Sequence, residues 1–249
     1  ADEPLLECTR YALSGGKRLR GLLPLAISHA CGLKSVRSLP LAAAIEMIHA
    51  ASLVVDDLPS MDASAERRER PSLHRMFNVA AAELTAHALV SGAYSLIAQA
   101  ELPAQTIVRL VHELARASGG RGMAWGQFVE LDPHAGQHDP QLIRSAKTGS
   151  LFGAAARMGA IAANADETTI ASFGSAGSHW GLAYQLRDDV HDEPLSVEVS
   201  ARLRIDCDEH LTAAEAILTS TPAIASTLTS FTASWLQPFY RSLGRLDVP

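Results

Sequence analysis

Aromatic residues and cysteines are scarce in this chain of 249 residues. Phe, Trp and Tyr make up 5% of it, whereas Ala and Leu recur throughout and apolar residues reach 47%. That composition lacks the β-branched and aromatic texture of sheets and favours helices. The three cysteines, Cys8, Cys31 and Cys207, are far apart and form no C-x-x-C pair. Their spacing argues against a disulfide framework or a cysteine zinc site and predicts a reducing, cytoplasmic compartment.

Long uninterrupted apolar runs and an excess of positive charge are also missing. The longest apolar candidate, residues 41–55, contains Glu46 and His49 and is shorter than the ~20 residues that a bilayer requires. We therefore expect no membrane span and, without a visible signal peptide, a soluble protein. The net charge is −6 and Lys and Arg are dispersed, which argues against a nucleic-acid partner but leaves room for a local phosphate site.

Apolar residues recur with helical periodicity over much of the chain. Segments separated by Gly, Pro or polar breaks predict helices over residues 40–57, 79–99, 104–118, 141–163, 167–191 and 212–220. No sequence repeat and no boundary between domains is visible, so residues 1–249 are expected to form one domain. The predicted fold class is all-α, a single-domain bundle of long helices.

One polar stripe follows the apolar segment that ends in "VVDD". At 100° per residue, Glu46, His49, Ser52, Asp56 and Asp57 fall within an arc of roughly 140°. The two adjacent carboxylates come directly after residues that look buried. Because buried carboxylates are costly unless cations hold them, this pair indicates a site rather than a solvated helix end.

A second polar stripe lies in "GLAYQLRDDVHDE". The same construction places Gly181, Gln185, Asp188, Asp189 and Asp192 within roughly 100° of one another. Two acidic stripes inside an apolar bundle predict a shared central cavity. Hard oxygen ligands suit Mg²⁺, which takes one or two carboxylates together with water and substrate phosphates. We therefore expect a phosphorylated ligand to complete the metal site.

Basic residues occur where such a ligand would need them. "GGKRLRG" places Lys17, Arg18 and Arg20 within one turn after two flexible glycines, a suitable geometry for holding a terminal phosphate. Further cations that the cavity would use are Arg67, Arg68 and Lys147.

These motifs, taken together, resemble a known family. "DDLPSMD" and "YQLRDDVHD" are similar to the two aspartate-rich motifs of the trans-type isoprenyl diphosphate synthases, and most closely to bacterial geranylgeranyl diphosphate synthases. "GGKRLR", "IEMIHAASLVVDD", "ERRERPSLH", "GQFVEL" and "KTGSLF" occur in the family's order. The resemblance implies an isoprenoid synthase fold, a homodimer, and a prenyltransferase that condenses isopentenyl diphosphate with an allylic diphosphate.

The resemblance also implies roles for individual residues. Mg²⁺, about three ions per active site, would be bound by Asp56, Asp57 and Asp62 on one side and by Asp188, Asp189 and Asp192 on the other. The allylic diphosphate would contact Arg67, Lys147 and Thr148, with Gln185 beside it. The diphosphate of isopentenyl diphosphate would be held by Lys17, Arg20, His49 and Arg68. Gln127 would lie near the reacting carbons. The expected catalytic residues are Asp56, Asp57, Lys147, Gln185 and Asp188.

Small residues one turn before the first motif bear on product length. Ala51 and Ser52 lie where the growing prenyl chain would pass. In the family resembled, an aromatic residue there closes the pocket at C15 and small residues leave room for C20. We therefore expect geranylgeranyl diphosphate as the main product, with Met47, a further turn away, as a candidate for the pocket floor.

Other activities of the same fold stay open at this point. A farnesyl or longer-chain diphosphate synthase, a terpene-cyclase-like enzyme that ionises the allylic diphosphate alone, and a non-catalytic subunit of a synthase are the alternatives. Some positions depart from the family pattern. Ala63, Ser64 and Ala65 replace common acidic residues, Glu69 replaces a usual Gly and Glu130 a usual Asp, and the Gly-Lys-Asp element expected after Glu193 is missing.

Overall fold

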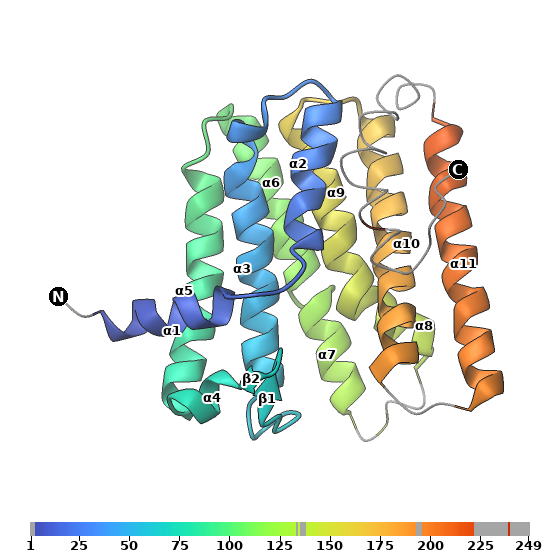
Figure 1. Cartoon of the computed structure of the whole chain (residues 1–249). Coiled ribbons are helices and arrows are strands. Elements are labelled where there is room, and N and C mark those ends of the chain that lie inside the picture. Colours follow the sequence, from blue (N-terminus) through green and yellow to red (C-terminus); the bar gives the residue numbers. More distant parts are fainter. Residues whose placement is uncertain (1–2, 133, 135–137, 193–195, 222–238, 240–249) are drawn as a thin grey trace.

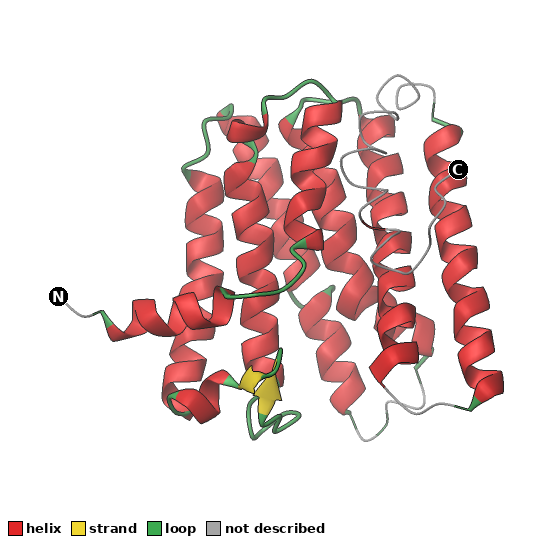
Figure 2. Cartoon of the chain, viewed as in Figure 1, coloured by secondary structure: helices red, strands yellow, loops and turns green. Residues whose placement is uncertain are grey.

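The computed structural model describes residues 3–132, 134, 138–192, 196–221 and 239, excluding the side chains of residues 191 and 192. These residues form a bundle of long helices (Figure 1, Figure 2). The long helices are α2 (Leu19–Ala30), α3 (Leu39–Asp56), α5 (Val79–Ala98), α6 (Ala104–Ser118), α9 (Ser150–Ala162), α10 (Glu167–Asp192) and α11 (Val197–Thr219). Shorter elements are α1 (Pro4–Leu13), η1 (Ser35–Arg37), α4 (Leu73–Met76), α7 (Met123–Leu131), α8 (Pro140–Arg144) and η3 (Ser145–Gly149).

The all-α prediction is confirmed, with small differences in the elements. The strands of the described residues are β1 (Glu66–Arg67) and β2 (Arg70–Pro71), which form one antiparallel hairpin. Helices α1, α2, α4 and α7 were not predicted, because they are short or, in α2, contain Pro24. Helix α11 begins at Val197 rather than at residue 212, since its first half is rich in charged residues and lacks a clear apolar periodicity.

Helix α9 forms the centre of the bundle. All of its residues except Ser150 and Arg157 are buried, and it packs against α2, α3, α6 and α10. Glycines allow two of these close approaches: a Cβ at Gly177 of α10 would lie 2.8 Å from the carbonyl oxygen of Phe152, and one at Gly159 would lie 2.8 Å from that of Pro24. These glycines therefore allow α2 and α10 to pack closely on α9.

Helix α3 carries the first acidic motif through the core. By length and composition it is apolar enough to cross a membrane. Its buried side chains instead pack on α2, α5 and α9, which is the behaviour of a core helix. The C-terminal ends of α3 and α10 lie at the same end of the bundle as α7, α8 and the hairpin (Figure 1). The two aspartate-rich motifs are therefore brought to one end of the molecule.

Candidate active site

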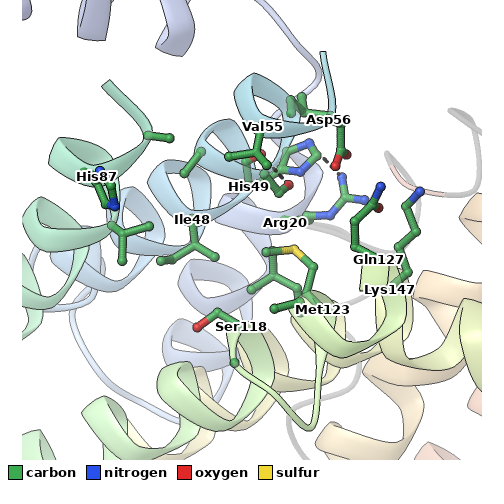
Figure 3. Close-up of a pocket in the computed structure, with 18 of the residues that line it drawn as sticks. Arg20, Ile48, His49, Val55, Asp56, His87, Ser118, Met123, Gln127 and Lys147 are labelled. Atoms are coloured by element: carbon green, nitrogen blue, oxygen red, sulfur yellow. Dashed lines mark hydrogen bonds between the residues drawn. The ribbon is translucent and has the colours of Figure 1, made fainter. Parts of the chain in front are cut away.

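A cavity of about 640 Å³ lies between α3, α5, α6, α7 and η3. Much of its wall is apolar and includes Ile48, Val55, Met123 and Leu151. The predicted site residues that line it are Arg20, His49, Ala51, Ser52, Asp56, Gln127, Lys147, Thr148 and Gln185. Figure 3 shows Asp56, Arg20, Gln127 and Lys147 gathered at one side of the cavity, with Ser118 and His87 farther away. The cavity thus combines a charged end with an apolar body.

Asp56 is the acidic group at the charged end. Burial raises the pKa of its carboxyl group from 3.8 to about 6, although the nearby Lys147 acts in the opposite direction. No described side chain donates a hydrogen bond to this carboxylate, although it lines the cavity. A half-buried carboxylate with no donor among the described side chains has its oxygen lone pairs available to a cation or to a bound ligand.

Asp57 has a different environment from its neighbour. Its side chain is 4% exposed, and its Oδ1 accepts hydrogen bonds from Nε of Arg67 at 3.0 Å and from Nη2 at 2.5 Å. This hydrogen-bonded pair raises the pKa of Arg67. Asp57 lines a small separate pocket with Tyr11 and Ser72 instead of the main cavity. In this structure the first motif therefore directs one carboxylate into the cavity and the other onto the hairpin.

Glu46, a second member of the predicted polar stripe on α3, also points away from the main cavity. The Oε1 atom of Glu46 accepts a hydrogen bond from the backbone N–H of Gly21 at 2.7 Å, and Oε2 accepts one from Nη1 of Arg18 at 3.1 Å. Glu46 and Met47 line a second groove, between α2 and α3. The expectation that Met47 forms the floor is wrong, because its Cε packs against Gly92 of α5, outside the main cavity.

Arg20 and His49 form a half-buried pair at the charged end. Nη1 of Arg20 lies 3.2 Å from Nε2 of His49. Because a guanidinium group only donates, Nε2 accepts, and the imidazole is neutral with its proton on Nδ1. Burial and then Arg20 lower the pKa of His49 well below its usual value. The guanidinium carbon of Arg20 is 4.7 Å from the ring centroid of Phe152 and 5.6 Å from that of Tyr184.

Lys147 and Thr148 lie in the π-helical segment η3, which interrupts the regular helix between α8 and α9. Such single π-turns re-aim side chains and are frequent at functional sites. Gly126 of α7 makes room for η3, because a Cβ there would lie 2.6 Å from the backbone nitrogen of Lys147. Nζ of Lys147 donates to Oε2 of Glu130. These contacts place Gln127 and Lys147 side by side at the cavity (Figure 3).

A chain of hydrogen bonds connects η3 with the second acidic motif. The hydroxyl group of Thr148 donates to Oε1 of Gln185 at 3.0 Å, and Nε2 of Gln185 donates to Oδ1 of Asp189 at 2.7 Å. Nε of Arg144 in α8 lies 3.7 Å from Oδ2 of Asp189. Burial lowers the pKa of Arg20, and the nearby Tyr184, Glu46 and Asp188 act in the opposite direction. The two polar stripes are therefore linked through η3 and Arg20.

The remaining predicted residues lie at the rim. Lys17 is exposed, with Nζ 5.9 Å from the ring centroid of Tyr184. Asp62 is exposed in the loop after α3, and Arg68 is exposed in the hairpin turn. The side chain of Asp192 lies outside the described residues. Among the residues that are described, no group of three His, Cys, Asp or Glu side chains converges closely enough to hold a metal ion alone.

Sequence reasoning missed several residues that complete this site. Glu130, Arg144 and Tyr184 contact or flank predicted residues, and Tyr94 and Ser118 join α5 to α6 where their hydroxyl oxygens lie 3.2 Å apart in the cavity wall. Arg144 could have been found from the sequence, because it lies three residues before Lys147 on one helical segment. No local pattern marks the contact between Tyr94 and Ser118, because they lie on different helices.

Comparison with known proteins supports the predicted family. Residues 2–204 match the polyprenyl synthetase family model. A farnesyl diphosphate synthase of Bacillus subtilis is 38% identical over 189 residues, which are 73% of this chain and 64% of that protein. Geranylgeranyl pyrophosphate synthase 4 of Arabidopsis thaliana is 37% identical over 196 residues, 76% of this chain and 53% of that protein. The chain thus spans between half and two thirds of these two relatives.

A solved structure agrees with these sequence relatives. The apo structure of an FPP/GFPP synthase from Zymomonas mobilis superposes with a TM-score of 0.80 at 30% identity, covering 92% of this chain and 88% of that one. The predicted isoprenoid synthase fold is therefore confirmed. Both farnesyl and geranylgeranyl synthases occur among the relatives. By the extent of the family match and by the similarity of sequence and fold, the chain belongs to the polyprenyl synthetase family.

Proposed function

We propose that this protein is a Mg²⁺-dependent prenyltransferase that condenses isopentenyl diphosphate with an allylic diphosphate and releases mainly geranylgeranyl diphosphate. The observation that carries the proposal is the cavity itself. An apolar space of about 640 Å³ has Asp56, Arg20 and Lys147 at one end. A prenyl diphosphate has the same division, because an apolar chain ends in a compact polyanion.

The donor set at the charged end fits Mg²⁺. Asp56 presents a carboxylate to which no described side chain donates, and Asp189 accepts a hydrogen bond from Gln185, which lines the cavity. No three described ligands converge, which suits an ion that keeps waters and takes substrate phosphate oxygens in addition to one or two carboxylates. Asp56, Asp57 and Asp62, with Asp188, Asp189 and Asp192, are the proposed ligands. When bound, the ions would neutralise the diphosphate as it leaves.

The protein's cations would contribute to the same charge stabilisation. Lys147 and Arg67 are proposed to bind the allylic diphosphate, and in this structure both are held in place by carboxylates, Glu130 and Asp57. Positive groups that are fixed before reaction lower the barrier to ionisation, because negative charge develops on the leaving diphosphate. Thr148 is proposed to contact the same group, and Gln185, its hydrogen-bond partner, to lie beside it.

The second diphosphate would bind nearer to α2. Arg20 and His49 are proposed to hold isopentenyl diphosphate together with Lys17 and Arg68. The double bond of isopentenyl diphosphate attacks the allylic cation, and the released diphosphate accepts the proton that restores a double bond. Gln127 lies beside Lys147 at the charged end (Figure 3) and is proposed to lie near the reacting carbons. The apolar lining excludes water that would otherwise capture the cation.

Small side chains along α3 support the C20 assignment. Ala51 is 4% exposed, and both it and Ser52 line the cavity. On the facing helix α5, lining residues extend from Glu83 to Tyr94, which corresponds to about 16 Å of helix. The space therefore continues well past Ala51, towards Tyr94 and Ser118. A product tail would enter this space from the charged end.

A product assay tests the proposal. The protein is incubated with Mg²⁺, isopentenyl diphosphate and each of the C5, C10 and C15 allylic diphosphates, and the products are sized. We expect C20 as the main product and shorter products from Ala51→Phe, because a rigid ring in the wall of a close-packed cavity blocks the tail. Ala43→Phe is the matched control, since Ala43 is an exposed alanine of α3 that lines the other groove.

The outcomes separate the alternatives. The absence of prenyl transfer would overturn the proposal, and product formation without isopentenyl diphosphate would favour a cyclase-like enzyme. A wild type that stops at C15, or an active Ala51→Phe variant with unchanged products, would contradict the C20 assignment alone.

A homodimer is the proposed assembly. The supporting observation is that α5 and α6 expose apolar side chains, with Leu84 at 59%, Val90 at 38% and Val108 at 61%. Val90 also lines the cavity, so a second copy packed there would help to close it. The molecular mass in solution tests this assembly.

A further inference from the structure

The hairpin that carries Arg67 and Arg68 has an unfavourable turn. Arg67 pairs with Arg70, so Arg68 and Glu69 are the two turn residues. Their φ angles are +56° and +61°. A two-residue hairpin turn with both φ values positive is normally built from Asn and Gly, because a side chain is strained in the left-handed region. Such a conformation persists only where the surroundings impose it.

Contacts to the end of α1 hold the second strand of this hairpin. Nη1 of Arg70 donates to Oγ of Ser14, and the guanidinium carbon of Arg70 lies 4.0 Å from the ring centroid of Tyr11. The hydroxyl group of Tyr11 donates to the carbonyl oxygen of Pro71 at 2.8 Å. Tyr11 itself is fixed by an edge-to-face contact with Phe77, whose ring centroid is 5.6 Å away. Arg70 thus connects the strand to a rigid support.

The hairpin turn fixes the position of the Arg68 side chain. Nη1 of Arg68 donates to the carbonyl oxygen of Ser14 at 2.9 Å. Its guanidinium group lies against Gly16, where a Cβ would be 2.9 Å from Cζ of Arg68. Gly16, at a φ of +84°, belongs to the loop that contains Lys17 and leads into α2. Arg68 therefore packs on the loop that presents Lys17, one of the other cations proposed for the second diphosphate.

We propose that Arg70 is a positioning residue for the diphosphate site. Together with Tyr11 and Ser14 it holds the strained turn in the conformation that places Arg68 on Gly16 and Arg67 on Asp57. Arg70 itself does not line the main cavity. The consequence for binding rests on the proposed function, whereas the consequence for the turn does not.

Four variants test this role. Arg70→Met removes the hydrogen bond and the charge but keeps an unbranched side chain. Glu69→Gly removes the left-handed strain at one turn position, since Gly adopts positive φ without a penalty. The double variant Glu69→Gly/Arg70→Met combines both changes. Arg75→Met is the matched control, because Arg75 is an exposed arginine of α4 whose side chain forms no hydrogen bond or ion pair with the described residues.

The main measurements are the two KM values, kcat, and the affinity for inorganic diphosphate by calorimetry. In Arg70→Met we expect the KM for isopentenyl diphosphate to rise about tenfold and diphosphate affinity to fall by a similar factor, since tenfold corresponds to the loss of one modest charged contact. The kcat value should change less than about threefold. The double variant should recover most of the loss, because its turn no longer needs Arg70, and Arg75→Met should match the wild type.

Two results would overturn the role of Arg70. One is an Arg70→Met variant with unchanged KM values and diphosphate affinity. The other is a loss that Glu69→Gly does not reverse, or that follows the melting temperature across all four variants, since either indicates a purely structural contact. If the wild type binds inorganic diphosphate but transfers no prenyl group, the proposed function fails, and the calorimetric affinities still decide whether Arg70 positions the site.

Discussion

Replacing the two adjacent aspartates of the first motif by asparagine should change stability in opposite directions. Asp56 has no described hydrogen-bond donor, and burial raises its pKa from 3.8 to about 6. One pKa unit corresponds to about 1.4 kcal/mol, so the ionised carboxylate lowers the free energy of unfolding by about 3 kcal/mol at pH 8. Asp56→Asn removes this charge and should raise the free energy of unfolding by about 2 kcal/mol, allowing for the buried amide.

Asp57→Asn should have the opposite effect. It breaks a bidentate pair in which the carboxylate is 4% exposed and Arg67 is 38% exposed. Breaking a fully buried pair costs about 3–5 kcal/mol, and hydration of Arg67 reduces this to about 2 kcal/mol. Both substitutions are expected to abolish most prenyl transfer. Stability and activity would thus change together at Asp57 and in opposite directions at Asp56.

The pH dependence gives a second check on Asp56. The folded protein binds a proton more tightly than the unfolded chain at this position, so the penalty is present above pH 6 and is lost as the pH falls towards 3.8. The charge penalty should fall to roughly half at pH 5, so the advantage of Asp56→Asn should fall from about 2 kcal/mol at pH 8 to about 0.6 kcal/mol at pH 5, because the cost of the buried amide does not change with pH. Urea unfolding in EDTA, followed by circular dichroism, measures the free energy of unfolding of the wild type and of Asp56→Asn at each pH. A destabilised Asp56→Asn variant, or an advantage that does not change with pH, would refute the reasoning.

Two further predictions concern Arg20 and the histidines. Arg20→Met should raise the KM for isopentenyl diphosphate by about 10- to 100-fold and much more than the KM for the allylic substrate, and equal increases in steady-state KM would contradict the division of the cavity. Burial lowers the pKa values of His49, His179 and His210, so below about pH 6.5 the unfolded chain binds protons that the folded one does not, and stability falls with falling pH. In His210→Gln the melting temperature should decrease less between pH 7 and pH 5 than in the wild type, once the opposing effect of Asp56 is measured separately. An unchanged slope would exclude His210 as a cause of the decrease.

The sequence by itself determined the fold class, the family and part of the polar lining of the cavity. Apolar residues at helical spacing placed α3, α5, α6 and α10 within a few residues of their observed bounds, because side-chain period follows from backbone geometry alone. The same geometry placed His49, Ser52 and Asp56 on one face of α3, and all three line the cavity. Local periodicity is sufficient for such statements.

Tertiary structure alone decided which polar groups face the cavity. Asp56 and Asp57 are neighbours in sequence, yet only the position of the hairpin directs Arg67 onto Asp57. Glu46 leaves the predicted stripe because the start of α2 presents a free backbone N–H group and Arg18 to it. Met47 packs on Gly92 of α5, which has no side chain at the point where α5 approaches α3. These outcomes depend on contacts between segments far apart in sequence, and a helical projection holds no information about what lies opposite each face.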